Sequence, residues 1–118
     1  MKVSEVAAFL EADVFSGKEH LDMDVYCACG ADLMSDVLAF VKHDAILLTG
    51  LVNPHVIRTA DMMDIKVVVF VRGKIPTDDV LEIAKEKEIV ILSTGMTMFT
   101  ACGTLFQEGL IGGWKEEG

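Results

Sequence analysis

Apolar runs and amphipathic segments alternate along most of this 118-residue chain. Four runs have the length and continuity of strands that are buried on both faces, at residues 25–29, 45–49, 66–71 and 89–92. A segment with helical periodicity follows each run, beginning near residues 36, 54, 78 and 98. Because each strand is followed by a helix, the pattern predicts a parallel sheet with helices on both faces and right-handed crossovers.

Residues with a strong capping preference mark where the helices begin. Ser4 is expected to cap a short N-terminal helix, and Ser35 to cap the helix that follows the first strand. Asn53 precedes Pro54, whose missing N–H costs nothing at the first helical position. Thr77 is expected to cap the next helix, which has acidic residues in its first turn and lysines in its last, as the helix dipole favours.

Apolar positions within these helices predict which side faces the sheet. Stripes at helical spacing fall at residues 6, 7, 9 and 10, at 37, 38 and 41, at 56, 57, 60 and 63, and at 98, 99, 102, 105 and 106. The last helix is expected to stop at Gly109, with Leu110 making the apolar contact of such a stop. Residues 12–17 are expected to be extended, residues 18–24 a loop, and the tail from Lys115 frayed.

Together these elements predict one α/β domain that spans residues 1–118. The expected architecture is a three-layer α/β/α sandwich with a four-stranded, mainly parallel sheet, plus an N-terminal helix. The length is that of a single domain, and no linker, repeat or low-complexity segment divides the chain.

Composition narrows the setting in which such a domain works. Hydrophobic residues make up 52% of the chain, which fits a sheet buried on both faces or an apolar face left for a partner subunit. No apolar run reaches the roughly 18 residues of a membrane span, and Glu5 and Glu11 interrupt any signal peptide. The net charge of −9 disfavours nucleic acid as a partner. Three cysteines without an export signal indicate reduced thiols in the cytoplasm.

A ligand is expected outside the carboxyl ends of the parallel strands, where each loop leads to a helix N-terminus. Free N–H groups and positive dipole ends converge there, which suits a small anion such as phosphate. Turn geometry and helix capping explain most polar residues of these loops equally well, and explain Arg72 and Lys74 least. The candidates in the four loops are Gly30, Asp32 and Ser35, then Thr49, Gly50 and Asn53, then Arg72, Gly73 and Lys74, and finally Ser93, Thr94, Gly95 and Thr97.

Fingerprints of catalysis and of common nucleotide sites are absent from the sequence. It contains neither glycine-rich phosphate-binding pattern, G-x-x-x-x-G-K-[ST] or G-x-G-x-x-G. It also lacks the hydrolase motifs G-x-S-x-G and H-E-x-x-H. We therefore expect a protein that is not an enzyme.

The cysteines offer a second hypothesis for a site. Cys27 and Cys29 are two residues apart on a predicted strand and therefore share one face, while Cys102 lies in the last helix. Core packing explains them, because cysteine behaves as a small buried hydrophobe. The alternative is that they hold a metal ion or an iron–sulfur cluster, for which one chain falls short of the usual four ligands.

Four segments together resemble the DRTGG domain family, across nearly the whole chain. They are residues 30–38 (GADLMSDVL), 48–54 (LTGLVNP), 69–76 (VFVRGKIP) and 93–103, which includes Met98-Phe99-Thr100-Ala101-Cys102-Gly103. The tetrapeptide core of the family name is absent. In place of the family's Asp-Arg and Gly-Gly elements, the chain has Leu48-Thr49-Gly50 and Arg72-Gly73-Lys74.

This resemblance carries expectations about function. DRTGG domains occur alone, between CBS domains in regulated pyrophosphatases and in some phosphotransacetylases, and they are similar to the N-terminal domain of HPr kinase/phosphorylase. The resemblance implies an α/β/α domain that forms a homodimer and has a regulatory, ligand-sensing role. It also implies that stand-alone members are associated with iron-only hydrogenase subunits.

Two functions follow as hypotheses. The first is a non-catalytic regulatory domain that binds a small anionic ligand, a nucleotide or phosphometabolite, at the carboxyl-end loops. The alternative is an accessory or interaction module of an iron-only hydrogenase or another electron-transfer complex, with an iron–sulfur cluster on Cys27, Cys29 and Cys102. Bound iron in protein purified without oxygen would distinguish the cluster-binding module from the ligand sensor.

Overall fold

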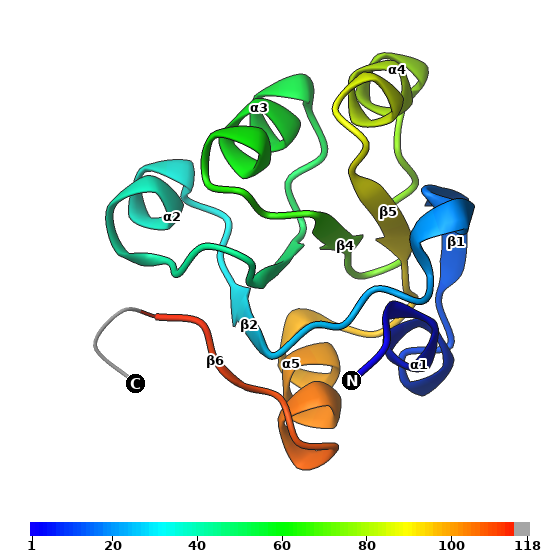
Figure 1. Ribbon diagram of the computed structural model, residues 1–118, viewed down its shortest axis with the longest axis vertical. Coiled ribbons are helices and arrows are strands. Elements are labelled where there is room, and N and C mark those ends of the chain that lie inside the picture. The colour runs from blue at the N-terminus through cyan, green and yellow to red at the C-terminus, as the bar shows by residue number, and fades with distance from the viewer. Residues whose placement is uncertain (115–118) are drawn as a thin grey trace.

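The computed structural model describes residues 1–114, which form three layers with a sheet in the middle (Figure 1). One face of the sheet is covered by three helices, α2 (Met34–Phe40), α3 (Pro54–Met62) and α4 (Asp78–Glu86). The other face is covered by two helices, α1 (Val3–Phe9) and α5 (Met98–Gln107). The α/β fold with helices on both faces is thus confirmed, and the tail predicted to fray from Lys115 lies outside the described residues.

Six strands make up the sheet, in the order β1-β5-β4-β3-β2-β6. The four central strands run parallel, as predicted, whereas β1 pairs antiparallel with β5 and β6 adds a short parallel edge beside β2. The expected four-stranded sheet is therefore only the parallel centre of a mixed sheet. The strands are β1 (Asp13–Ser16), β2 (Cys27–Gly30), β3 (Ile46–Thr49), β4 (Val67–Phe70), β5 (Val90–Ser93) and β6 (Ile111–Gly112).

Both edge strands depend on contacts that local pattern does not reveal. β1 falls in the piece predicted to be extended, and the register of its pairing with β5 is interrupted by a bulge between Val14 and Ser16. β6 has two residues, too few to show a period. It reaches β2 because Gly113 has no side chain: a Cβ there would lie 2.9 Å from the Ala45 Cβ and 3.3 Å from the backbone of Ala28.

Burial on both faces explains the continuous apolar runs. Every residue of β3, β4 and β5 is buried. Leu47 and Val68 belong to the core beneath α2, α3 and α4, and the next residue along each strand, Leu48 and Val69, belongs to the core beneath α1 and α5. Successive residues of these strands therefore point to opposite cores, and both sets must be apolar. None of the helices within residues 1–114 is long and apolar enough to cross a membrane.

Local capping signals located two helix ends correctly. The Asn53 side chain accepts a hydrogen bond of 3.1 Å from the Val56 N–H, with Pro54 at the start of α3. At the end of α5, Gly109 has φ +115°, and the Leu110 N–H donates to the Leu105 carbonyl at 3.0 Å. This bond and the buried Leu110 side chain are those of a Schellman stop.

Two predicted serine caps are wrong because each helix begins before its serine, α1 at Val3 and α2 at Met34. Ser4 therefore lies in the first turn of α1 rather than before it. Its N–H donates a hydrogen bond of 3.0 Å to the carbonyl of Leu21, a residue in the connection between β1 and β2. That connection also contains a 3-10 turn, Lys18–His20, where a plain loop was expected. In α2 the helix begins after Leu33, so Ser35 lies inside the first turn, which buried Met34 anchors in the core.

Thr77 occupies the predicted cap position of α4 but caps it indirectly. Its hydroxyl donates to the Asp79 carboxylate, and that carboxylate accepts the Val80 N–H at 2.9 Å. The hydrogen bond from Thr77 lowers the pKa of the Asp79 carboxyl group below its ordinary value. The negative charge therefore persists at the positive end of the helix, where it is favourable.

The predicted inward stripe of α5 is wrong for its two phenylalanines. Ala101 and Leu105 face the core, whereas Phe99 is 88% exposed and Phe106 is 73% exposed. α5 lies on the sheet beside α1 and over β2 and β3. Its outer side extends toward the short β6 edge, where no described helix covers it (Figure 1). Leu38 of α2, also predicted to point inward, is 40% exposed.

Candidate functional site

The loops that follow the four parallel strands meet at one end of the sheet, because the strands share one direction. Main-chain hydrogen bonds join the last two of these loops. The Arg72 N–H donates to the Met96 carbonyl at 2.7 Å, and the Gly73 N–H donates to the Thr94 carbonyl at 2.9 Å. The backbone that carries the predicted cationic side chains is therefore held firmly, and its N–H groups are already used.

Asp32 joins the first loop to the second. Its Oδ1 atom accepts hydrogen bonds from the Thr49 hydroxyl at 2.9 Å and from the Gly50 N–H at 2.8 Å. The Thr49 Oγ1 atom in turn accepts the Leu51 N–H at 3.1 Å, and the Thr49 side chain is fully buried. Asp32, Thr49 and the Gly50 N–H, all predicted to contact a ligand, are thus engaged in holding the loops together.

Arg72 reaches across to this pair from the third loop. A Cβ atom on Gly50 would lie 3.2 Å from Arg72 Nη2 and 3.7 Å from Asp32 Oδ1, so the glycine makes room for the guanidinium. The backbone of Arg72 has φ +59°, a left-handed conformation that costs a non-glycine residue about 1 kcal/mol or more. Among residues 1–114 the guanidinium has no ion-pair or hydrogen-bond partner, and it is exposed.

Lys74 adds a second exposed cation two residues further on. Its carbonyl accepts a 2.5 Å hydrogen bond from the Ser93 hydroxyl, which ties the backbone of this loop to the end of β5. Gly73 between the two cations has φ +70° and open space around it. The segment 72–74 therefore presents two positively charged side chains to solvent from a fixed backbone.

Other predicted binding residues have structural tasks. The buried Thr94 hydroxyl donates to the Leu10 carbonyl at 2.6 Å and accepts the Met96 N–H at 3.2 Å. Thr97 caps α5 by accepting the Thr100 N–H at 3.4 Å, and Asn53 caps α3 as described above. The predicted set thus resolves into residues that build the loops and two cations that extend from them.

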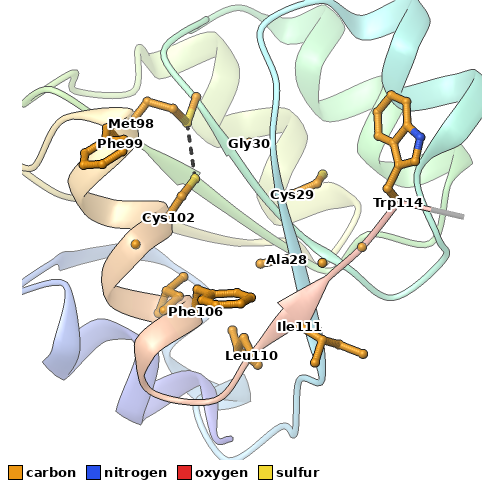
Figure 2. Close-up of a pocket in the computed structure, with 14 residues that line it drawn as sticks. Ala28, Cys29, Gly30, Met98, Phe99, Cys102, Phe106, Leu110, Ile111 and Trp114 are labelled. Carbon is orange, nitrogen blue, oxygen red and sulfur yellow. Dashed lines mark hydrogen bonds between the residues drawn. The ribbon is translucent and has the colours of Figure 1, made fainter. Parts of the chain in front are cut away.

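A groove of about 620 Å³ lies beside this end of the sheet, between α5 and the β2–β6 edge (Figure 2). Met98, Cys102 and Phe106 project into it from α5, and the ring of Phe106 lies between the helix and β6 (Figure 2). Gly30, the last residue of β2, lines the end of the groove that is nearest the loops. A Cβ there would lie 2.8 Å from both Cys102 Sγ and Met98 Sδ, so glycine permits this close packing.

Sequence reasoning did not find this groove. The groove exists because β6 forms an edge and because Phe106 lies outside the core, and both facts depend on long-range packing. Among the described residues that line it, none carries a charged side chain or an imidazole. The available signal was the glycine at position 103 between two aromatic residues of a helix, Phe99 and Phe106.

The three cysteines divide between the two faces of the sheet. Cys27 and Cys29 share one face of β2, as their spacing predicts, and pack with the core beneath α2, α3 and α4. Cys102 packs with the opposite core, and Figure 2 shows the Cys29 side chain directed away from it. Within residues 1–114 no group of three histidine, cysteine or acidic residues could hold a metal ion. The predicted metal ligands are therefore not assembled within one chain.

Burial also changes the acidity of these thiols. It raises the pKa of Cys27 and Cys102 above the ordinary value, and it raises the pKa of Cys29 to about 12, with smaller contributions from the neighbouring Cys27 and Cys102. Metals and electrophiles react with the thiolate rather than the thiol. At neutral pH all three thiols are therefore held in the protonated form in this fold, which makes them weak nucleophiles.

Comparison with known proteins identifies the fold. No protein-family model matches the chain, and no curated protein does. A similar solved structure is the crystal structure of the CBS and DRTGG domains of the regulatory region of Clostridium perfringens pyrophosphatase, complexed with the activator diadenosine tetraphosphate. The TM-score is 0.75 at 15% sequence identity, over 98% of this chain and 49% of that one. The chain thus shares its fold with about half the length of that protein.

Proposed function

We propose that this protein is a non-catalytic regulatory domain that binds a small anionic ligand, a nucleotide or phosphometabolite, at the carboxyl-end loops of its sheet. The observation that carries the proposal is that the Arg72 side chain is exposed and has no ion-pair partner among the described residues. Its guanidinium lies over Gly50 without an ion-pair partner in residues 1–114, although the chain holds 19 acidic residues and a net charge of −9. An exposed arginine held in a strained backbone conformation is well placed for an anion from solution.

The neighbouring cation fits the same chemistry. Arginine can bind a phosphate through two parallel N–H···O bonds, and lysine adds a mobile point charge. Arg72 and Lys74 are separated only by Gly73, which leaves the space above the loop open. A ligand with two or more phosphate groups would engage both side chains.

The shared fold supports a regulatory rather than a catalytic role. The structure to which the chain is similar belongs to a regulatory region, and its complex contains a nucleotide activator. The raised thiol pKa values and the uncharged groove of this chain also offer little acid–base or nucleophilic chemistry. We extend the proposal to a DRTGG-type domain that works as a cytoplasmic homodimer, which sedimentation of the purified protein would test.

Isothermal titration calorimetry tests the ligand site. The probes are ATP, diadenosine tetraphosphate and inorganic tripolyphosphate, and the variants are Arg72→Asn and Lys74→Ala. Asparagine tolerates the left-handed backbone at position 72, so the charge is removed with little strain. We expect the dissociation constant to rise about tenfold or more in Arg72→Asn, because a hydrogen bond to a charged group contributes about 1.5–3 kcal/mol.

The matched control removes a lysine elsewhere. Lys85 lies in the last turn of α4, which runs back from the loops toward the opposite end of the sheet. Lys85→Ala makes the same change in net charge as Lys74→Ala and should bind the probes as the wild type does. The proposal is wrong if none of the three probes binds the wild type, or if a folded Arg72→Asn variant binds them with unchanged affinity.

A further inference from the structure

A glycine stands in the middle of α5, and the packing of residues 1–114 gives no reason for it. Gly103 lies in a helix that runs from Met98 to Gln107. A glycine inside a helix costs about 0.5–1 kcal/mol relative to alanine. A Cβ at position 103 would meet no atom within 4 Å in the structure, so no close contact offsets this cost. Gly103 lines the groove, and its missing side chain leaves space against the helix for a molecule from outside.

The groove combines apolar walls with a short edge of backbone. The ring of Phe106 lies in it, and none of its described residues is charged (Figure 2). Phe99 and Trp114 border it, but the Trp114 ring is stacked on Phe40 of α2, with 4.8 Å between the ring centroids, and packs with the core on the other face of the sheet. Within residues 1–114, β6 pairs with Cys27 and Ala28, and Gly30 at the end of β2 has no strand partner on that side. An unpaired strand edge presents peptide N–H and C=O groups.

We infer that this groove binds the base of a nucleotide, an inference that rests on the proposed function and deepens it. A nucleobase has flat apolar faces that can stack on the Phe106 ring and a polar edge for the free peptide groups at the end of β2. A fatty chain would leave those peptide groups without partners. An added peptide strand would need a longer edge than the end of β2 provides. The volume of about 620 Å³ lies within the range of small-molecule sites, about 300–1,000 Å³.

The charges of the two neighbouring regions agree with this assignment. The groove is uncharged and suits a neutral base, whereas the loops carry the cations that suit phosphate. The two regions are adjacent through three residues. Gly30 lines the groove, and Asp32, two residues later, accepts the Gly50 N–H. The Arg72 guanidinium lies over Gly50. A nucleotide with its base in the groove would therefore direct its phosphates toward Arg72.

Comparing ligands with and without a base tests the inference. Trp114 is the only tryptophan of the chain and borders the groove at its β6 edge, with its ring stacked on Phe40. A ligand in the groove would change the surroundings of this residue, so Trp114 fluorescence can follow binding. We expect at least one of ATP, GTP, CTP and UTP to bind about fivefold or more tightly than tripolyphosphate, which matches the lower end of base–aromatic stacking. Only the nucleotide should change the Trp114 emission.

A variant that fills the groove gives the decisive comparison. Gly103→Leu places a side chain in the open space and should reduce nucleotide affinity to that of tripolyphosphate, with tripolyphosphate binding unchanged. Gln107→Leu introduces the same side chain at an exposed position of α5 outside the groove and should behave as the wild type. Circular dichroism checks folding, and Gly103→Ala serves as a smaller substitution if the leucine variant does not fold.

The outcomes separate this inference from the proposed function. If Gly103→Leu retains the wild-type preference for a nucleotide over tripolyphosphate, the groove does not hold the base and the inference is wrong, while the loop site stands. Equal binding of tripolyphosphate and all four nucleotides by the wild type has the same meaning. If no probe binds at all, both the groove assignment and the proposed function are wrong.

Discussion

The buried hydroxyl of Thr49 donates a 2.9 Å hydrogen bond to the carboxylate of Asp32, a residue 17 positions away in sequence. The same carboxylate oxygen accepts the Gly50 N–H. Through these two bonds the loop after β2 is fastened to the end of β3. A carboxylate at this place also brings a negative charge to the end of the sheet where Arg72 lies, so it influences anion binding as well as stability.

Replacing Asp32 should separate these two effects. Asp32→Ala leaves the Thr49 hydroxyl and the Gly50 N–H without their acceptor, and we expect the free energy of unfolding to fall by about 1–3 kcal/mol. Asp32→Asn keeps an oxygen acceptor but removes the charge, so it should remain more stable than the alanine variant and bind tripolyphosphate more tightly than the wild type. Urea denaturation and calorimetry measure both quantities. An alanine variant as stable as the wild type would contradict the role assigned to Asp32.

Thr94 should prove important for stability rather than for binding. Its hydroxyl connects the backbone beyond α1 to the loop before α5, through Leu10 and Met96. Thr94→Val preserves the shape but leaves buried polar groups unpaired, and we expect a loss of about 1–3 kcal/mol in the free energy of unfolding. Ser35→Ala, at an exposed position of α2, is the control and should change stability by no more than about 0.5 kcal/mol. Comparable losses in the two variants would show that the Thr94 bonds contribute little.

Gly103 should be replaceable with a gain in stability. Because a Cβ meets open space there, Gly103→Ala should raise the free energy of unfolding by about 0.5–1 kcal/mol through helix propensity alone. Gly17→Ala is the contrasting case, since Gly17 has φ +85° and its added Cβ would lie 2.9 Å from the Val90 Cα. That variant should be clearly destabilised. Chemical denaturation of both variants measures whether the free energy of unfolding rises in Gly103→Ala and falls in Gly17→Ala. Destabilisation by Gly103→Ala would mean that the glycine serves the packing of this chain.

Alkaline pH should weaken the fold through Cys29. Burial raises its pKa from 9.0 to about 12 in the folded state, so the folded protein holds this proton more tightly than the unfolded chain does. The contribution is complete below pH 9.0 and is lost as the pH rises toward about 12. We expect the free energy of unfolding to fall between about pH 9 and about pH 12, and to fall less in Cys29→Ala. Identical pH dependence in the two proteins would exclude Cys29 as the source.

Local sequence pattern determined the centre of this fold. The runs around β3, β4 and β5 are apolar at every position because both faces are covered, and this shows in consecutive residues. The Asn53 cap and the Gly109 stop were also readable, because their hydrogen bonds join residues only three to five positions apart. Because the four central strands are parallel, the sequence also predicted that the loops following them lie together at one end of the sheet.

Tertiary structure alone decided the edges of the sheet and the use of the site residues. Whether β6 pairs with β2, or whether Phe106 lies in the core or in a groove, depends on residues far apart in sequence. The same holds for the choice between binding and structure at Thr49, Thr94 and Arg72, which have similar loop positions. Two of these side chains meet partners from distant segments and are buried, and Arg72 meets none among residues 1–114. Local periodicity carries no information about such partners, because they are set by how the layers pack.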